Sequence, residues 1–308
     1  GYERITWPLA SLGKLMFSQQ LVNALSLGSV YALFALGFTL VFGVLGVINL
    51  SHGAVFMLGA YVALTLVTAW NLPIWLATLL AMLVCGLLGL TIDFLVLRPL
   101  RARSAPHLAP MVATIGVAIL LTSVAQGLFG AEVSRFPHAT IPETGMQFGK
   151  VYVSAIQVFT FVAAALLMLF LWLIVKYTRI GAAVRAVSEN QKTAYLLGID
   201  VEGMFRLVSF SAAALGGAAG VLIGLSFNAI SPSMGQPILP KGIAVIILGG
   251  MGDMRGAMLG GLFLGFAEVM SVAYLSSDYR DAVAFGLVFL VLLVRSQGLF
   301  GTSSERKA

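Results

Sequence analysis

The 308 residues are 59% hydrophobic and only 10% charged, whereas a soluble domain carries about a quarter charged residues. This composition excludes a soluble globular domain and predicts a polytopic membrane protein. The formal net charge of +6 does not indicate a nucleic-acid partner, because the Lys and Arg residues lie in short loops between apolar runs and not along one stripe. The single cysteine, Cys85, allows no disulfide within the chain.

The apolar runs divide the chain into membrane segments, because one span needs about 20 mostly apolar residues. Seven runs fit this length, and two shorter or interrupted runs raise the expected total to about eight or nine segments. We therefore predict an all-α transmembrane bundle over residues 18–301, preceded by an N-terminal extension at 1–17 and followed by a tail at 302–308. The seven expected spans are Leu21 to Leu45, Ile74 to Leu97, Leu108 to Phe129, Ser154 to Val175, Leu207 to Ile230, Gly256 to Leu275 and Ala282 to Val294.

The two segments that fit less well are predicted to be broken or re-entrant helices. Leu50 to Ala69 is interrupted by serine, histidine and glycine, and Gly242 to Gly252 is short and rich in glycine. Irregular backbone in a membrane is tolerated only where it lines a cavity or is buried in protein. The candidates for a translocation pathway are therefore Asn49, Ser51, His52, Gly249, Gly250 and Gly252. For the first three, the favoured interpretation is that they satisfy backbone groups freed by the break, and contact with the solute is the alternative.

Two carboxylates inside apolar runs need a partner. Asp93 lies close to Arg98, and a local ion pair is the favoured interpretation. Glu268 lies in the middle of a span, where it is either a structural hydrogen-bond anchor or a further pathway residue.

The distribution of Lys and Arg predicts the orientation of the chain. Basic residues gather in the loop around Arg98 to Arg103, in the stretch 178–206 and in the tail that starts at Arg295. These three regions should be cytoplasmic. If both irregular segments cross the membrane, the N-terminus lies outside.

The polar stretch 178–206 is the most distinctive part of the chain, because apolar residues recur in it near helical spacing between two glycines, Gly181 and Gly198. We expect one short amphipathic helix there, on which a partner outside the membrane docks.

A set of closely spaced glycines also stands out: Gly216, Gly220 and Gly224, then Gly256 with Gly260 and Gly261 with Gly265. These predict close helix packing within the chain, with a subunit interface as the alternative.

The sequence carries little chemistry of its own. The three histidines are scattered and have no ligand partners at metal spacing. The string from Gly145 to Lys150 is one residue too short for a P-loop and lacks its Ser or Thr. We therefore expect neither an enzyme nor an ATP-binding protein.

Several motifs together resemble the LivH-type permeases of branched-chain amino-acid ABC importers. The first is LVNALSLGSVYALFALGFTLVFGVLGVINLSHGAVFMLGAY from Leu21, which has the family's Asn, His-Gly and Met-x-Gly-Ala-Tyr positions. The others are LGGMGDMRGAMLGGLFLGFAE from Leu248 and RSQGLFG from Arg295. Ser51 and Ser296 depart from the family pattern, which usually has Ala and Pro there. The resemblance extends from Leu21 to Gly301, and residues 1–17 match nothing.

The resemblance implies an ABC importer permease in a bacterial-type inner membrane, surrounded by lipid. Its partners would be a similar LivM-like permease, two cytoplasmic ATPases that bind ATP and Mg²⁺, and an extracytoplasmic solute-binding protein. Transport would proceed by alternating access, with the stretch 178–206 as the coupling loop. Its coupling residues would be Gly181, Arg185, Glu189, Asn190, Ala194, Leu197 and Gly198. The alternatives are an importer of urea or short-chain amides and, in another class, a secondary transporter or a channel.

Overall fold

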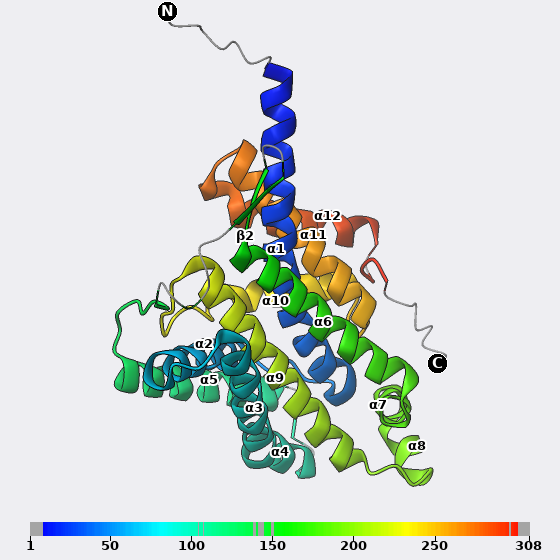
Figure 1. Ribbon diagram of the computed structural model, residues 1–308. Coiled ribbons are helices and arrows are strands. Elements are labelled where there is room, and N and C mark those ends of the chain that lie inside the picture. The colour runs from blue at the N-terminus through cyan, green and yellow to red at the C-terminus, as the bar shows by residue number, and fades with distance from the viewer. Residues whose placement is uncertain are drawn as a thin grey trace, which may run out of the picture.

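The computed structural model describes residues 9–103, 105–106, 108–137, 140, 145–148, 151–295 and 297–300. These residues form a helical bundle with one small β-hairpin (Figure 1). The first half consists of α1 (Leu9–Leu45), α2 (His52–Trp70), α3 (Ile74–Ile92), a π-helical turn (Asp93–Leu97), α4 (Arg98–Ala102) and α5 (Leu108–Phe129). The hairpin β1 (Gly145–Phe148) and β2 (Val151–Ser154) follows. The rest consists of α6 (Ala155–Tyr177), α7 (Arg179–Glu189), α8 (Gln191–Leu196), α9 (Val201–Phe227), α10 (Ile238–Gly249), α11 (Met254–Tyr274), a 3-10 turn (Ser277–Tyr279) and α12 (Arg280–Val294).

Seven helices among the described residues are long and apolar enough to cross a membrane, which confirms the predicted polytopic helical bundle. They are Met16–Leu45 of α1, α2, the continuous segment Ile74–Ala102, α5, α6, α9 and α11. Two further apolar helices, α10 and α12, are shorter. Each predicted span overlaps one of these helices; the run from Leu108 to Phe129 has the bounds of α5, whereas α9 (Val201–Phe227) begins and ends earlier than the predicted span from Leu207 to Ile230.

Helices α1 and α9 form the centre of the bundle, and both are mostly buried by the helices around them. Glycines allow this packing, because a side chain at several of them would collide with the backbone of a neighbouring helix. Gly220 of α9 lies against the carbonyl group of Phe56 in α2, and Gly59 of α2 lies against the backbone of Gly217. On the other side of the centre, Gly265 of α11 lies against the backbone of Gly28 in α1. The closely spaced glycines therefore serve packing within the chain.

The segment from Leu50 to Ala69 differs from the prediction of a broken helix. Helix α2 is continuous, and the irregular part is the connection 46–51 before it. The two glycines that suggested a break instead meet other backbone segments: Gly53 faces the carbonyl of Gly235, and Gly59 faces Gly217. Segment 242–252, in contrast, ends a short helix of 12 residues, α10, which at about 1.5 Å per residue crosses only part of a bilayer.

The β-hairpin was not predicted, because its two strands are only 4 residues long each. It lies beside the first half of α1 (Figure 1). The Gln19 side chain donates to the carbonyl of Tyr152 over 2.9 Å and accepts from the amide of the same residue over 3.0 Å. The last strand residue, Ser154, then begins α6 with a capping box that it forms with Gln157.

Basic residues collect at the end of the bundle where α1 terminates, which we call the basic end. Helices α4, α7 and α8 lie there, far from the hairpin (Figure 1). The α10–α11 turn also belongs to this end, because an added Cβ at Gly43 of α1 would lie 3.5 Å from Gly252. The chain after α12 joins it, since the amide of Leu299 donates to the carbonyl of Leu248 over 2.8 Å. All three predicted cytoplasmic regions thus share one end, in agreement with the expected orientation.

The contact of α9 with α2 can be tested at Gly220. Alanine should favour the helix at any exposed position, but at Gly220 its methyl group would meet the Phe56 carbonyl. We expect Gly220→Ala to lower the free energy of unfolding by about 1–3 kcal/mol, as overpacking does. Gly286→Ala is the matched control, because apart from its own helix no described residue has an atom within 4 Å of an added Cβ there. Equal stability of both variants in a denaturant titration of the purified protein would contradict this packing.

Candidate functional site

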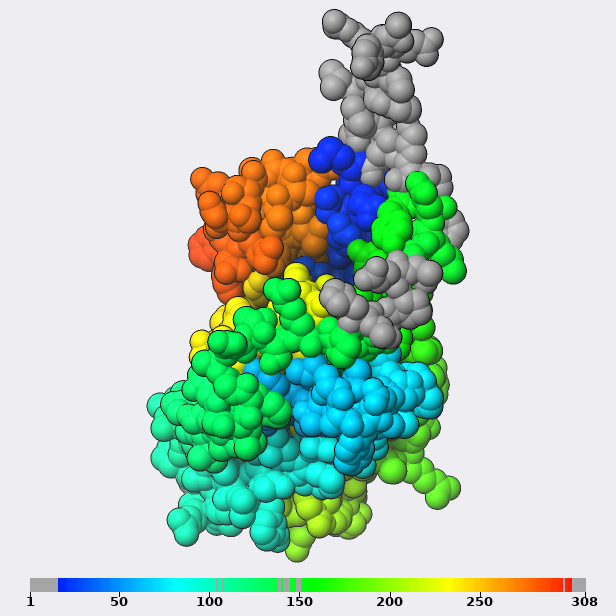
Figure 2. Space-filling model, turned by 60° about the vertical axis from the view of Figure 1, so that its left-hand side comes forward, coloured from blue at the N-terminus to red at the C-terminus, as the bar shows by residue number. Residues whose placement is uncertain are grey.

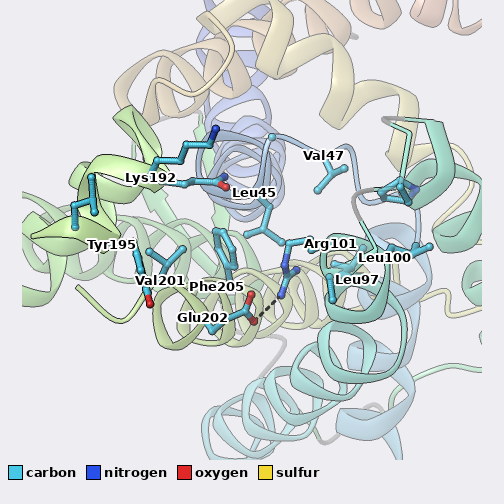
Figure 3. A pocket seen from close by; sticks show the side chains of 16 residues that line it. Leu45, Val47, Leu97, Leu100, Arg101, Lys192, Tyr195, Val201, Glu202 and Phe205 are labelled. Atoms are coloured by element: carbon cyan, nitrogen blue, oxygen red, sulfur yellow. Dashed lines mark hydrogen bonds and ion pairs between the residues drawn. The ribbon is translucent and has the colours of Figure 1, made fainter. Parts of the chain in front are cut away.

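A cavity of about 770 Å³ opens at the basic end (Figure 3). It lies where the end of α1, helices α4 and α8, and the start of α9 meet. Apolar side chains form most of its wall, and Arg101 and Glu202 face each other at its edge. The labelled residues around it are Leu45, Val47, Leu97, Leu100, Arg101, Lys192, Tyr195, Val201, Glu202 and Phe205.

An ion-pair network joins α4 to α9 beside this cavity. The Arg101 guanidinium lies 2.8 Å from the Asp93 carboxylate and 3.3 Å from Glu202, and it stacks 4.5 Å from the centre of the Phe205 ring. The predicted local ion pair of Asp93 is present, but its partner is Arg101 and not Arg98. Arg98 turns to the exposed side, where it reaches Glu202 at 3.7 Å, while Arg101 extends back to the fully buried Asp93.

The polar stretch 178–206 contains two short helices in place of the predicted single helix. The chain becomes extended at Asn190, with φ −156° and ψ 107°, and the Asn190 side chain accepts from the amide of Thr193 to begin α8. An Asx cap inside the stretch thus ends α7 and starts α8. Gly198, with φ +82°, lies after α8 in a left-handed conformation that suits glycine.

Helix α7 is held tightly against the end of α6. Gly181 packs against the carbonyl groups of Ile174 and Val175, where a side chain would not fit. The Arg185 guanidinium donates to the carbonyls of Val175 and Lys176, which α6 leaves unpaired at its C-terminus. These two candidate coupling residues therefore fix the stretch to a membrane helix.

Helix α8 ends in an exposed apolar group, Tyr195, Leu196 and Leu197, which we call the apolar tip. The relative exposures are 72%, 83% and 74%. Ala194 is 1% exposed and packs into the fold, so it cannot contact a partner directly. Glu189, Asn190 and Gly198 are exposed beside the tip. Tyr195 and Leu196 were not among the predicted coupling residues, although two large apolar side chains in a polar loop are a signal that the sequence contains.

Asn49, Ser51 and His52 organise the connection between α1 and α2. The Asn49 side-chain oxygen accepts from the amide of Ser51 over 3.1 Å and from its hydroxyl over 2.6 Å. The buried His52 ring lies between Phe34 and Phe38, and its Nε2 is 3.3 Å from the Phe34 carbonyl. The contacts of these three residues thus hold the α1–α2 connection in place. A role of these residues in translocation stays a prediction.

The structure separates the two groups of predicted pathway residues. His52 and Gly53 lie near Gly235, where α10 is about to begin. Gly249, Gly250 and Gly252 form the turn after α10, and the last two have φ values of 103° and 91°. Helix α10 lies between the groups, and its 12 residues correspond to about 18 Å. The three glycines form a tight turn at the basic end, where Gly249 meets the backbone of Gly256.

Glu268 lies in a charge cluster at the other end of α10, in which Glu268 and Lys241 are buried and Arg280 and Asp281 are partly exposed. Its Oε1 is 2.9 Å from Lys241 Nζ and 3.3 Å from Arg280 Nε. Lys241 also lies 3.3 Å from Asp281 and donates to the Tyr31 hydroxyl over 3.3 Å. The cluster thus joins α1, α10, α11 and α12. In the sequence, Lys241 lies at the boundary of a predicted segment and has no predicted role. Its pairing with Glu268 depends on how the helices pack.

Comparison with known proteins agrees with this architecture. The family described as branched-chain amino acid transport system, permease component, matches residues 20–292. The chain is 36% identical to the high-affinity branched-chain amino acid transport system permease protein BraD of Pseudomonas aeruginosa, over 94% of this chain and 98% of that protein. It is 35% identical to the corresponding LivH of Salmonella typhimurium, over 95% and 98% of the two chains. The similarity to Escherichia coli LivM is 28%, over 96% of this chain and 72% of LivM.

The ion pair of Asp93 provides a stability test. Arg101→Gln would leave a fully buried carboxylate without its cation, which typically costs about 3–5 kcal/mol. Arg98→Gln is the matched control, because the Arg98 side chain is 49% exposed and such a pair contributes at most about 1 kcal/mol. Denaturant titrations of the two variants should show this difference. A loss of stability no larger for Arg101→Gln than for Arg98→Gln would contradict the role of the buried pair.

Proposed function

The chain belongs to the branched-chain amino acid transport system permease family, and from this membership we propose that it is one permease subunit of an ATP-driven importer in a bacterial-type inner membrane. The proposed solutes are branched-chain and other neutral amino acids, after the printed functions of the relatives BraD and LivH. The solute moves inward by alternating access of the helices around the pathway.

The apolar tip is the observation that carries this proposal. Apolar side chains gathered on a polar, basic surface mark a site of protein contact, and the last two residues of α8 and Leu197 after it are exposed there. The tip also has the attachment that a coupling element needs. Through α7, Arg185 ties it to the end of α6, and Gln191 donates to the Val44 carbonyl of α1 over 3.2 Å. Movement of a partner bound at the tip would therefore reach the central helix α1 directly.

The proposed partner at the tip is a cytoplasmic ATPase, one of two in the complete transporter. ATP and Mg²⁺ bind to these ATPases and not to this chain. A homologous permease of the LivM type is the second membrane partner, and the similarity to LivM supports it. Helix α5 is a candidate surface for that contact, since it exposes Leu108, Val112, Ile119, Leu120 and Leu128. An extracytoplasmic binding protein delivers the solute.

Two alternatives make different predictions about energy and solute. A secondary transporter would use ionisable groups inside the membrane for ion coupling. Here the buried carboxylates Asp93 and Glu268 are both paired with basic side chains, which favours an external energy source. An importer of urea or short amides would share the fold and the ATPases. Competition of labelled leucine uptake by valine, alanine, acetamide and urea distinguishes these solutes.

Substitution at the apolar tip tests the coupling. Leu196→Glu should abolish most leucine uptake, because a charge replaces an 83% exposed apolar side chain at the proposed interface. The variant should still fold, since the substituted side chain is mostly exposed. The matched control is Leu275→Glu, which is 67% exposed at the end of α11 remote from the basic end. Both variants are expressed with the other subunits, and uptake and copurification of the ATPases are measured.

In this experiment Leu196→Glu is expected to lose the ATPases or their stimulation, while Leu275→Glu keeps both. Ala194 does not serve as a test position, because its burial means that Ala194→Asp would disturb the fold itself. Wild-type uptake and ATPase stimulation in Leu196→Glu would exclude the tip as the coupling element.

A further inference from the structure

A second cavity, of about 370 Å³, lies in the half of the bundle away from the basic end. It is enclosed by the first half of α1, the start of α6, the end of α9 and the second half of α11. Figure 2 shows this end, with the start of α1 (blue) between α11 and α12 (orange) and the hairpin with α6 (green). The volume falls within the range of small-molecule sites, about 300–1,000 Å³. The polar residues in its wall are Gln20, Asn23, Ser26, Ser154, Gln157, Ser226, Glu268 and Arg280.

Glu268 lies in the wall of this cavity, and its unpaired acceptor, which is buried in the structure, would reach a bound molecule once the side chain turns toward the cavity. The residue is 1% exposed; its Oε1 accepts a hydrogen bond from Lys241 and lies 3.3 Å from Arg280 Nε. Its Oε2 is equally buried but has no hydrogen-bond partner in the part of the chain that the structure describes. A buried carboxylate oxygen without a donor is costly, and such groups in native proteins call for an explanation. A bound molecule with N–H groups would supply the donor.

The charges of the cluster decide which kind of molecule fits. Lys241 and Arg280 are balanced by Glu268 and Asp281, which lie within 3.3 Å of Lys241 or Arg280. A simple cation at Oε2 would leave the buried centre of the cluster, Glu268 and Lys241, with an excess positive charge, and an anion would leave it negative. Both are unfavourable in a poorly solvated site. A zwitterion adds no net charge.

Donors for the negative end of such a molecule lie in the same wall. Among the described residues, Arg280 Nε has no hydrogen-bond partner, and the Arg280 side chain, which is 43% exposed, contacts Glu268 only as an ion pair. The amide nitrogen of Gln157 donates to Asn23 over 2.7 Å, and that of Asn23 donates to Gln20 over 3.1 Å. Each amide nitrogen carries two N–H groups, so each has a second donor available. The apolar part of the wall, Leu27, Val30, Ile223, Val269 and Val272, suits an aliphatic side chain.

We propose that this cavity binds a zwitterionic neutral α-amino acid, whose ammonium group donates to Glu268 Oε2 and whose carboxylate accepts from Arg280 and the amides of Asn23 and Gln157. This inference rests on the proposed function and specifies where the permease itself contacts its solute. Of the two predicted roles of Glu268, it assigns the pathway role in addition to the ion pair.

The test uses the assembled permease pair with its ATPases in lipid nanodiscs, without the binding protein. Binding of labelled L-leucine is measured and is competed with 4-methylpentanoate, which lacks the ammonium group, and with 3-methylbutylamine, which lacks the carboxylate. Unlabelled leucine should compete at least about tenfold better than either analogue, because each leaves one buried polar partner unpaired. Equal competition by all three compounds would overturn the zwitterion site.

Three variants locate the site. Glu268→Gln should weaken leucine binding at least about tenfold and remove its advantage over 4-methylpentanoate, which a purely structural role would not do. Ala273→Leu fills the cavity from α11 and leaves every charge in place, so it should also abolish binding and decides the matter if Glu268→Gln fails to assemble. Asp278→Asn, an exposed carboxylate in the α11–α12 connection outside the cavity and the cluster, is the control and should bind as wild type.

Uptake measured with the binding protein and ATP distinguishes failure of the proposed cavity from failure of the proposed transport function. If the wild-type transporter takes up leucine and Ala273→Leu does so at the same rate and with unchanged binding, the cavity is not the site, while the proposed function stands. If the wild-type assembly takes up no amino acid, the proposed function itself is wrong.

Discussion

Close approach of helix backbones at glycine is the constraint on which the rest of this structure depends. Helices in lipid gain little from burying apolar side chains against one another, so packing of small residues has to hold them together. Gly217 and Gly220 bring α9 against α2, and Gly28 and Gly265 bring α1 against α11. These contacts leave α1 and α9 as a close-packed centre. The two buried charge groups, at Asp93 and at Glu268, lie at opposite ends of this centre and join the outer helices to it.

This arrangement gives a transport protein a continuous connection between its two ends. At the basic end, α7 and α8 are attached to α6 through Arg185 and to α1 through Gln191. At the other end, Tyr31 of α1 belongs to the cluster around Lys241 and Glu268. Helix α1 therefore contacts both the proposed coupling element and the proposed solute cavity. A shift of α1 driven from the apolar tip would alter the cavity without any separate linkage.

The sequence predicted the membrane helices well, because a span leaves a long apolar run, as from Leu108 to Phe129. It did not predict the role of Gly53 and Gly59 in α2, since glycine is typical both of a broken helix and of close helix packing. Only the residues that pack against these glycines show which of the two applies. The cap at Asn190 that divides the polar stretch depends on local geometry. The partners of Asp93 and Glu268 depend on tertiary packing, as the 27-residue separation of Lys241 and Glu268 shows. The cavity lies between helices that are far apart in the sequence, so the residue pattern of any single helix does not predict it.

Leucine uptake into proteoliposomes tests the central claim most directly. The complete transporter is reconstituted with ATP enclosed on the side of its ATPases and with the solute-binding protein on the other side. The account predicts accumulation of leucine against its gradient that requires both ATP and the binding protein and that survives collapse of the ion gradients. Accumulation without ATP, driven by a proton or sodium gradient, or mere equilibration of leucine would contradict it.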